Sequence, residues 1–213
     1  MALSGGIRRR TYANPYGARV DAMSSDTRTD HPGAFLTDVE TLRRLAKAHI
    51  EQGVVTDTYE GDVSRTIEIL QAVLATEIVC VLRYTQHSIM ATGLASESVR
   101  AEFAEHARQE QEHAMAVAAR INQLGGAPDF NPATLTGRSA SEYQTGADLV
   151  DMIRENLIAE RIAVDHYREL VRYFGDTDPV TRVMLEKILS VEEEHASDLQ
   201  DLMATHRHRP AAS

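Results

Sequence analysis

The sequence predicts an all-α fold: an antiparallel four-helix bundle with a long crossover between its second and third helices, preceded by an N-terminal extension. Three observations support this prediction. Four long segments carry apolar residues at helical spacing, no segment shows a strand signal, and about 20 residues separate the second helical segment from the third. At 1.5 Å per residue, helices of about 28 residues are each about 42 Å long, and equal lengths favour side-by-side packing.

The composition fits one domain with a full hydrophobic core. The chain has 213 residues, of which 43% are apolar. No run approaches the roughly 20 consecutive apolar residues of a membrane helix, and the first 20 residues lack the apolar stretch of a signal peptide, so we expect a cytoplasmic protein without a membrane partner. The single cysteine, Cys80, excludes an internal disulfide and any cysteine-based zinc or iron-sulfur site within one chain.

Residues 1–61 are expected to form the extension, a flexible basic arm followed by a short helix. Residues 1–20 contain four arginines and no acidic residue, although the whole chain has a formal net charge of -10. That acidic balance argues against a chain wholly specialised for nucleic acid, because phosphate binding requires clustered Lys and Arg. The arm is therefore either a disordered tail or a DNA-binding segment. The short helix is expected between Thr37 as N-cap and Gly53 as stop.

The bundle itself is expected at residues 62–206, followed by a short tail at 207–213. Its first two helices are predicted at about residues 64–91 and 98–124, the second ending at a Gly-Gly pair that tolerates a left-handed cap.

The second pair of helices has clear start signals. The third helix is predicted to open at Thr145 and Asp148, which are spaced as a capping box, and to end near residue 175. The fourth has Asp178 as N-cap and Pro179 at the first helical position, and fades near His206.

Each predicted helix turns one glutamate into its apolar stripe, and two helices add a histidine three residues later, on the same face. Four buried carboxylates are costly unless they are compensated, because each charge removed from water costs several kcal/mol. Two divalent cations would balance the four negative charges, and imidazoles would complete the coordination. The candidate metal-binding and catalytic residues are Glu77, Glu110, His113, Glu160, Glu192 and His195.

This ligand set indicates the metal. One Glu from each of two helices, with Glu-x-x-His from each of the other two, is the arrangement of di-iron and di-manganese carboxylate bundles. Mixed oxygen and imidazole ligation suits iron or manganese better than magnesium. We therefore expect two iron ions per subunit, with manganese as the alternative, and a site that can deliver two electrons to O2 or peroxide.

The chain resembles the ferritin-like superfamily, specifically bacterioferritins and Dps-like mini-ferritins with a bacterioferritin-type site. The resemblance covers about residues 62–205 and rests on the stretches "LATEIVCVLRYTQH", "EHARQEQEHAMAVAARINQLGG", "NLIAERIAVDHYRELV" and "ILSVEEEHASDL". It implies ferroxidase activity and iron storage inside a hollow homo-oligomeric shell. It also implies ligand roles: one iron on Glu77 and His113, the other on Glu160 and His195, with bridging carboxylates from Glu110 and Glu192.

The chain also departs from that family pattern. Bacterioferritins place a haem-ligating Met directly after the first Glu of the second helix's motif, where this chain has Gln111, so haem is not expected. The larger family members carry a fifth short helix, whereas this sequence ends soon after the fourth, which favours a shell of 12 subunits over 24. Cys80 stands alone, whereas some Dps-like proteins have a nearby cysteine pair.

Two other functions fit the same residues. One is a non-storing dimetal enzyme, either a manganese catalase or a rubrerythrin-like peroxidase. The other is a DNA-protecting nucleoid protein that uses the Arg-rich arm at residues 1–20.

Several residues outside the ligand set have two interpretations. Tyr84 and Tyr167 either hydrogen-bond ligand carboxylates or are core aromatics. Cys80 is expected to be a small buried hydrophobe rather than an oxidant sensor. His87, His106 and His166 are expected at the surface or at an interface. His206 and His208 either bind metal or, as the simpler account, are cations that complement the dipole at the end of the fourth helix.

Overall fold

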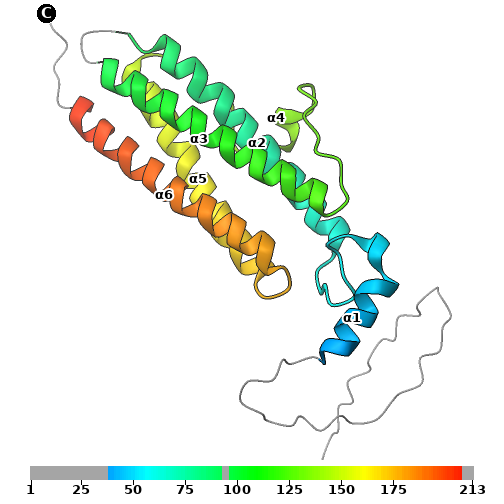
Figure 1. Cartoon of the computed structure of the whole chain (residues 1–213). Coiled ribbons are helices and arrows are strands. Elements are labelled where there is room, and N and C mark those ends of the chain that lie inside the picture. The colour runs from blue at the N-terminus through cyan, green and yellow to red at the C-terminus, as the bar shows by residue number, and fades with distance from the viewer. Residues whose placement is uncertain (1–37, 93–95, 208–213) are drawn as a thin grey trace, which may run out of the picture. The chain divides into compact units, whose positions relative to one another are not determined.

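The four long helices form two antiparallel pairs in the computed structural model, which describes residues 38–92 and 96–207 (Figure 1). α2 packs mainly against α3, and α5 against α6. The described residues contain no strand, so the predicted all-α bundle is confirmed. The long helices are α2 (Val63–Met90), α3 (Ser96–Gln123), α5 (Leu149–Phe174) and α6 (Pro179–Arg207).

The chain divides into two compact units, residues 1–46 and 47–213. The first unit contributes most of α1 (Val39–Ala48), where the Asp38 carboxylate accepts a hydrogen bond of 2.8 Å from the backbone N–H of Thr41. The predicted cap Thr37 and the basic arm lie outside the described residues. The second unit begins with the short 3-10 helix η1 (Ile50–Gln52) and contains the bundle. The expected domain limits at residues 61 and 206 stay a prediction.

Acidic caps start three of the long helices. Asp62, Asp148 and Asp178 each accept a hydrogen bond from the backbone N–H three residues later. The predicted capping box at Thr145 is wrong, because α5 begins only at Leu149 and Asp148 alone caps it. The predicted end of the second helix is confirmed: α3 ends at Gln123, and two residues later Gly125 adopts a left-handed φ of 86°.

The connection between α3 and α5 runs along α2, as Figure 1 shows. The Gln71 side chain donates to the carbonyl of Ala127 at 2.7 Å and accepts from the N–H of Asp129 at 2.9 Å. Further along, Arg138 at the end of the short helix α4 (Leu135–Arg138) donates to the Gln71 carbonyl at 2.9 Å. Side chains therefore hold the predicted crossover against α2. The crossover also contains the short helix α4, which the sequence pattern did not indicate.

Two apolar clusters fill the bundle, one toward each end. The first is built around Leu70, Leu74, Val117, Ile121, Leu170, Phe174, Leu185 and Ile188. The second is built around Tyr84, Val99, Phe103, Met152, Ile153, Leu199 and Met203. On every long helix the candidate ligands lie between the residues of the first cluster and those of the second. The core therefore encloses a polar layer near the middle of the bundle.

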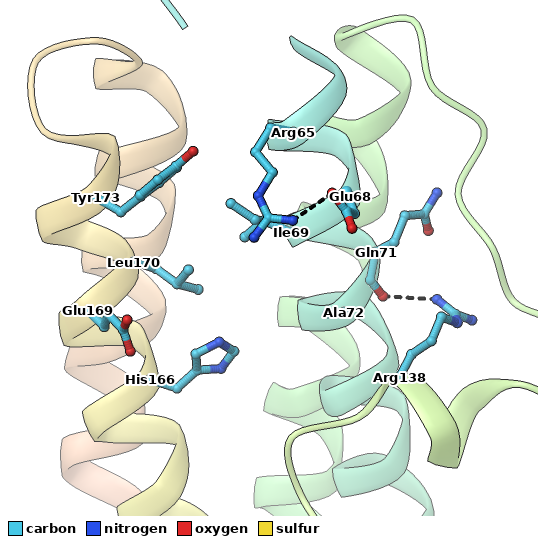
Figure 2. Close-up of a pocket in the computed structure, with 10 residues that line it drawn as sticks. All are labelled: Arg65, Glu68, Ile69, Gln71, Ala72, Arg138, His166, Glu169, Leu170 and Tyr173. Atoms are coloured by element: carbon cyan, nitrogen blue, oxygen red, sulfur yellow. Dashed lines mark hydrogen bonds and ion pairs between the residues drawn. The ribbon is translucent and has the colours of Figure 1, made fainter. Parts of the chain in front are cut away.

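The surface of the bundle has a groove between α2 and α5. It has a volume of about 580 Å³, and Figure 2 shows Arg65, Glu68 and Ile69 on one wall opposite His166 and Tyr173 on the other. None of the candidate ligands lines it.

Across the described residues, no helix combines the length and apolar character needed to cross a membrane.

Candidate metal centre

The structure brings all six candidate ligands into the polar layer and buries them. Each side chain comes from the middle of one of the four long helices, and none of the six residues is more than 7% exposed. Two overlapping groups have ligand atoms within 4.8 Å of one another. The first is Glu77, Glu110, His113 and Glu192; the second is Glu110, Glu160, Glu192 and His195. Because Glu110 and Glu192 belong to both groups, they have the positions of bridging carboxylates.

The two histidines lie on either side of the shared carboxylates. The Nδ1 atom of His113 is 3.0 Å from an oxygen of Glu192 and 3.3 Å from one of Glu77. The Nδ1 atom of His195 is 3.4 Å from the other Glu192 oxygen and 3.6 Å from Glu110. Each imidazole therefore presents its Nδ1 atom to a separate set of carboxylate oxygens.

At least one ligand atom of every candidate residue makes no hydrogen bond with the described protein. These atoms are Oε2 of Glu77, Oε1 of Glu110, Nδ1 of His113, Oε2 of Glu160, both carboxylate oxygens of Glu192, and Nδ1 of His195. Buried polar atoms are normally paired, because leaving one unpaired costs about 1–3 kcal/mol. A cluster of unpaired donor atoms at the centre of a bundle fits a metal site better than it fits a structural role.

Two tyrosines orient the outer glutamates in a crosswise pattern. Tyr84 on α2 donates a hydrogen bond to Glu160 on α5, and Tyr167 on α5 donates to Glu77 on α2 at 2.5 Å. The interpretation that these tyrosines hydrogen-bond ligand carboxylates is confirmed. Each bond occupies one carboxylate oxygen and leaves the other oxygen facing the centre.

Gln109 is a supporting residue that the sequence analysis missed. Its Oε1 atom lies 2.7 Å from Nε2 of His195. An Nε2–H that donates to this oxygen leaves Nδ1 of His195 available to a metal ion. Only its position directly before Glu110 in the chain could have suggested this role.

Without metal, protons neutralise the centre. Burial and the neighbouring carboxylates raise the pKa values of Glu77 and Glu160 well above the usual value. Burial opposes protonation of the histidines, but the surrounding carboxylates outweigh it and raise the pKa of His113 to about 12 and that of His195 to about 9. The same two histidines lower the pKa of Glu192 against the effect of burial. Metal ions must therefore displace protons at this site.

Two histidines were wrongly predicted at the surface. His87 is fully buried beside Phe103, with ring centroids 5.8 Å apart, and His106 is 1% exposed. His106 lies four residues before Glu110, on the ligand-bearing face of α3, and its ring stacks on His195 at a centroid distance of 3.9 Å. Burial and the neighbouring His195 lower its pKa to about 3. The spacing of four residues was the signal that could have placed it inside.

The other residues outside the ligand set behave more simply. Cys80 is buried, and burial raises the pKa of its thiol, as expected of a small core residue. His166 is half-buried and lines the α2–α5 groove. His206 contacts the Leu202 carbonyl at 2.8 Å near the end of α6, while His208 lies outside the described residues.

Comparisons with known proteins agree with this architecture. Residues 67–207 match the ferritin-like domain family. The chain is 31% identical over 146 residues to the DNA protection during starvation protein of Pyrococcus furiosus. The aligned residues cover 67% of this chain and 78% of that protein.

Solved structures give the same result. The dodecameric thioferritin of Bacteroides fragilis, a bacterioferritin-related protein, is 27% identical with a TM-score of 0.66, covering 78% of this chain and 94% of that one. Dps from Thermosynechococcus elongatus shares the fold at 15% identity and a TM-score of 0.63, over 66% of this chain and 90% of that one. The chain therefore belongs to the ferritin-like superfamily, among the mini-ferritins.

Proposed function

We propose that this chain is a ferroxidase that binds two Fe(II) ions at the buried centre, oxidises them with O2 or H2O2, and stores the product. The observation that carries the proposal is the set of unpaired ligand atoms on six buried residues from four helices. Four carboxylates and two imidazoles neutralise two divalent ions. In this proposal iron is the substrate, and the two ions together supply the two electrons that reduce one H2O2 to water.

The ligand roles follow from the two overlapping groups. Glu77 and His113 would hold one Fe(II), and Glu160 and His195 the other, while Glu110 and Glu192 would bridge them. Support comes from the shared positions of the last two residues and from the tyrosine hydrogen bonds on the outer two carboxylates. On binding, the ions displace protons from the histidines and the outer glutamates.

A cleft between α3 and α6 offers a path for the oxidant. It has a volume of about 670 Å³ and reaches His113. Its walls are mainly apolar and include Val180, Val183, Met184 and Ile188. Because O2 is apolar, it can cross such a surface without losing strong hydration, whereas a cation would be disfavoured there.

Storage requires a cage, and a shell of 12 subunits is favoured. The relative from Bacteroides fragilis is described as dodecameric, and nearly all of that chain is covered by this one. DNA protection is named for the Pyrococcus furiosus relative. For this chain, DNA binding depends on residues 1–20, which lie outside the described residues, and deletion of that arm would test it directly.

The test is an anaerobic load of the metal-free protein with Fe(II), followed by O2 or H2O2, with iron oxidation and retained iron measured together. We expect fast oxidation and retention well beyond two ions per chain. Glu110→Ala should slow oxidation at least about 100-fold, because even supporting residues of metal sites contribute roughly 10–100-fold. The matched control is Glu105→Ala, which removes an exposed carboxylate paired with Arg108 on the same helix.

Three results would contradict the proposal. Undiminished oxidation in Glu110→Ala would show that the reaction occurs elsewhere. Iron retention that stops at two per chain would favour a non-storing enzyme. Rapid peroxide turnover without net iron oxidation would indicate a catalase.

A further inference from the structure

A third group of potential metal ligands lies outside the six residues of the buried centre. Glu102 and His106 are four residues apart on one face of α3, and Asp198 faces them from α6. One donor atom from each lies within 4.8 Å of the others. The Nε2 atom of His106 is 3.2 Å from Oε1 of Glu102 and 3.9 Å from Oδ2 of Asp198.

The state of His106 distinguishes this group from an ordinary acidic surface patch. Its side chain is 1% exposed, and neither ring nitrogen makes a hydrogen bond with the described residues. A buried imidazole normally has at least one partner, because desolvation of a polar group without a hydrogen bond is unfavourable. The Nε2 atom instead points at two carboxylates, which are themselves cation ligands.

The two carboxylates connect this group to the protein surface. Their side chains are 38% and 44% exposed, and no Lys or Arg in the described ranges forms an ion pair with either one. At the inner end, the His106 ring stacks against His195, a candidate ligand of the buried centre. The group therefore extends from the surface to the edge of the dimetal site.

We propose that Glu102, His106 and Asp198 form a third divalent-cation site, which captures Fe(II) at the surface and loads it into the buried centre. Two carboxylates and one neutral imidazole balance the charge of one divalent ion. This donor set suits Fe(II), Mn(II) and Zn(II). Three protein ligands leave the remaining positions to water, which favours the reversible binding that transit requires. The loading role rests on the proposed ferroxidase function, whereas the cation site does not.

The binding test uses the full chain, freed of metal and titrated with Zn(II) by calorimetry. Wild-type protein should bind three ions per chain, two in the buried centre and one at the new site. The double variant Glu102→Gln with Asp198→Asn should bind two. The control, Glu97→Gln with Asp201→Asn, makes the same charge change on exposed residues of the same two helices and should still bind three. Two ions in wild type, or three in the first variant, would overturn the site.

The loading test measures the initial rate of Fe(II) oxidation over a range of Fe(II) concentrations. At limiting Fe(II), the Glu102→Gln/Asp198→Asn variant should be slower by roughly 10-fold, because local negative charge raises cation association by about that factor or more. At saturating Fe(II), its rate should equal that of wild type. Equal rates at all concentrations would overturn the loading role. If wild type oxidises no Fe(II) but the Zn(II) count still falls from three to two, the ferroxidase proposal fails and the cation site stands.

Discussion

The bundle contains two buried charged clusters, and their hydrogen bonding differs sharply. Near one end, Arg120 on α3 forms an ion pair with Asp178, in which its Nη2 atom lies 2.9 and 3.0 Å from the two carboxylate oxygens. Thr181 and Tyr59 donate further hydrogen bonds to the same carboxylate. In the middle of the bundle, by contrast, every candidate ligand keeps at least one ligand atom without a hydrogen bond.

This difference separates a structural cluster from a functional one. A buried ion pair with all of its hydrogen bonds made is self-sufficient and connects the start of α6 to α3. A group of carboxylates and imidazoles with unpaired atoms is complete only when something else binds. The two clusters should therefore respond in opposite ways to substitution, to pH and to metal.

The largest effect is expected at the structural cluster. Arg120→Met leaves the Asp178 carboxylate buried without its partner, which should lower the free energy of unfolding by about 3–5 kcal/mol. Denaturant unfolding of the metal-free protein measures this change. The control is Arg108→Met, which breaks exposed pairs with Glu105 and Glu112 and should leave stability nearly unchanged, because exposed ion pairs contribute little. Equal losses in the two variants would mean that the buried pair contributes no more than a surface pair.

pH should act on the central cluster instead. The pKa of His195 rises from 6.5 to about 9 on folding, so its stabilising proton is fully bound below pH 6.5 and lost as pH rises through 9. The raised pKa values of Glu77 and Glu160 act in the same direction. His195 alone should therefore cost the metal-free protein about 3 kcal/mol of stability between pH 6.5 and 9.

Thermal unfolding at several pH values checks this expectation, and metal should reverse the trend. Because metal binding displaces protons, the stabilisation that Zn(II) provides should increase over the same pH range. A metal-free protein whose melting temperature rises from pH 6.5 to 9 would contradict the assigned protonation of the centre.

Substitution of Glu77 should affect metal binding but not the stability of the metal-free protein. At a concentration of 100 times Kd, one bound ion stabilises the folded state by about 2.7 kcal/mol. The raised pKa of Glu77 favours its neutral form without metal, and Gln is a neutral side chain of the same shape, so Glu77→Gln should leave the metal-free protein nearly unchanged. The same variant should lose most of the stabilisation by Zn(II). Calorimetric melting with and without Zn(II) tests both points, and full stabilisation in the variant would remove Glu77 from the ligand set.

The sequence predicted the features that depend on helical periodicity and on helix capping. Apolar spacing and capping residues located the four long helices, and Glu77 and Glu160 stood out because each interrupts an apolar stripe. The Glu-x-x-His motifs at residues 110–113 and 192–195 placed the remaining candidate ligands on the inner faces.

Contacts between distant segments were not predictable in this way. Arg83 is buried, yet nothing in its local sequence indicates its partners: Asn156 on α5 at 2.9 Å, and Ser141 in the crossover at 2.8 Å. His106 was misplaced because a histidine on a helix rich in charged residues resembles a surface residue. Its burial results from packing against Tyr84 and His195, which lie on other helices.

The smallest effect is expected from substitution of the two tyrosines, and it should show whether the two ions of the centre bind independently. Tyr84→Phe removes the hydrogen bond to Glu160, and Tyr167→Phe removes the bond to Glu77. Each change should weaken metal binding by roughly 10-fold, with stability reduced by about 1 kcal/mol or less. Because the two bonds support opposite ions, each variant should weaken only one of the two Zn(II) sites in a calorimetric titration. The control Tyr173→Phe changes an exposed ring and should weaken neither, and an equal loss at both sites in Tyr84→Phe would show that the two ions bind as one coupled unit.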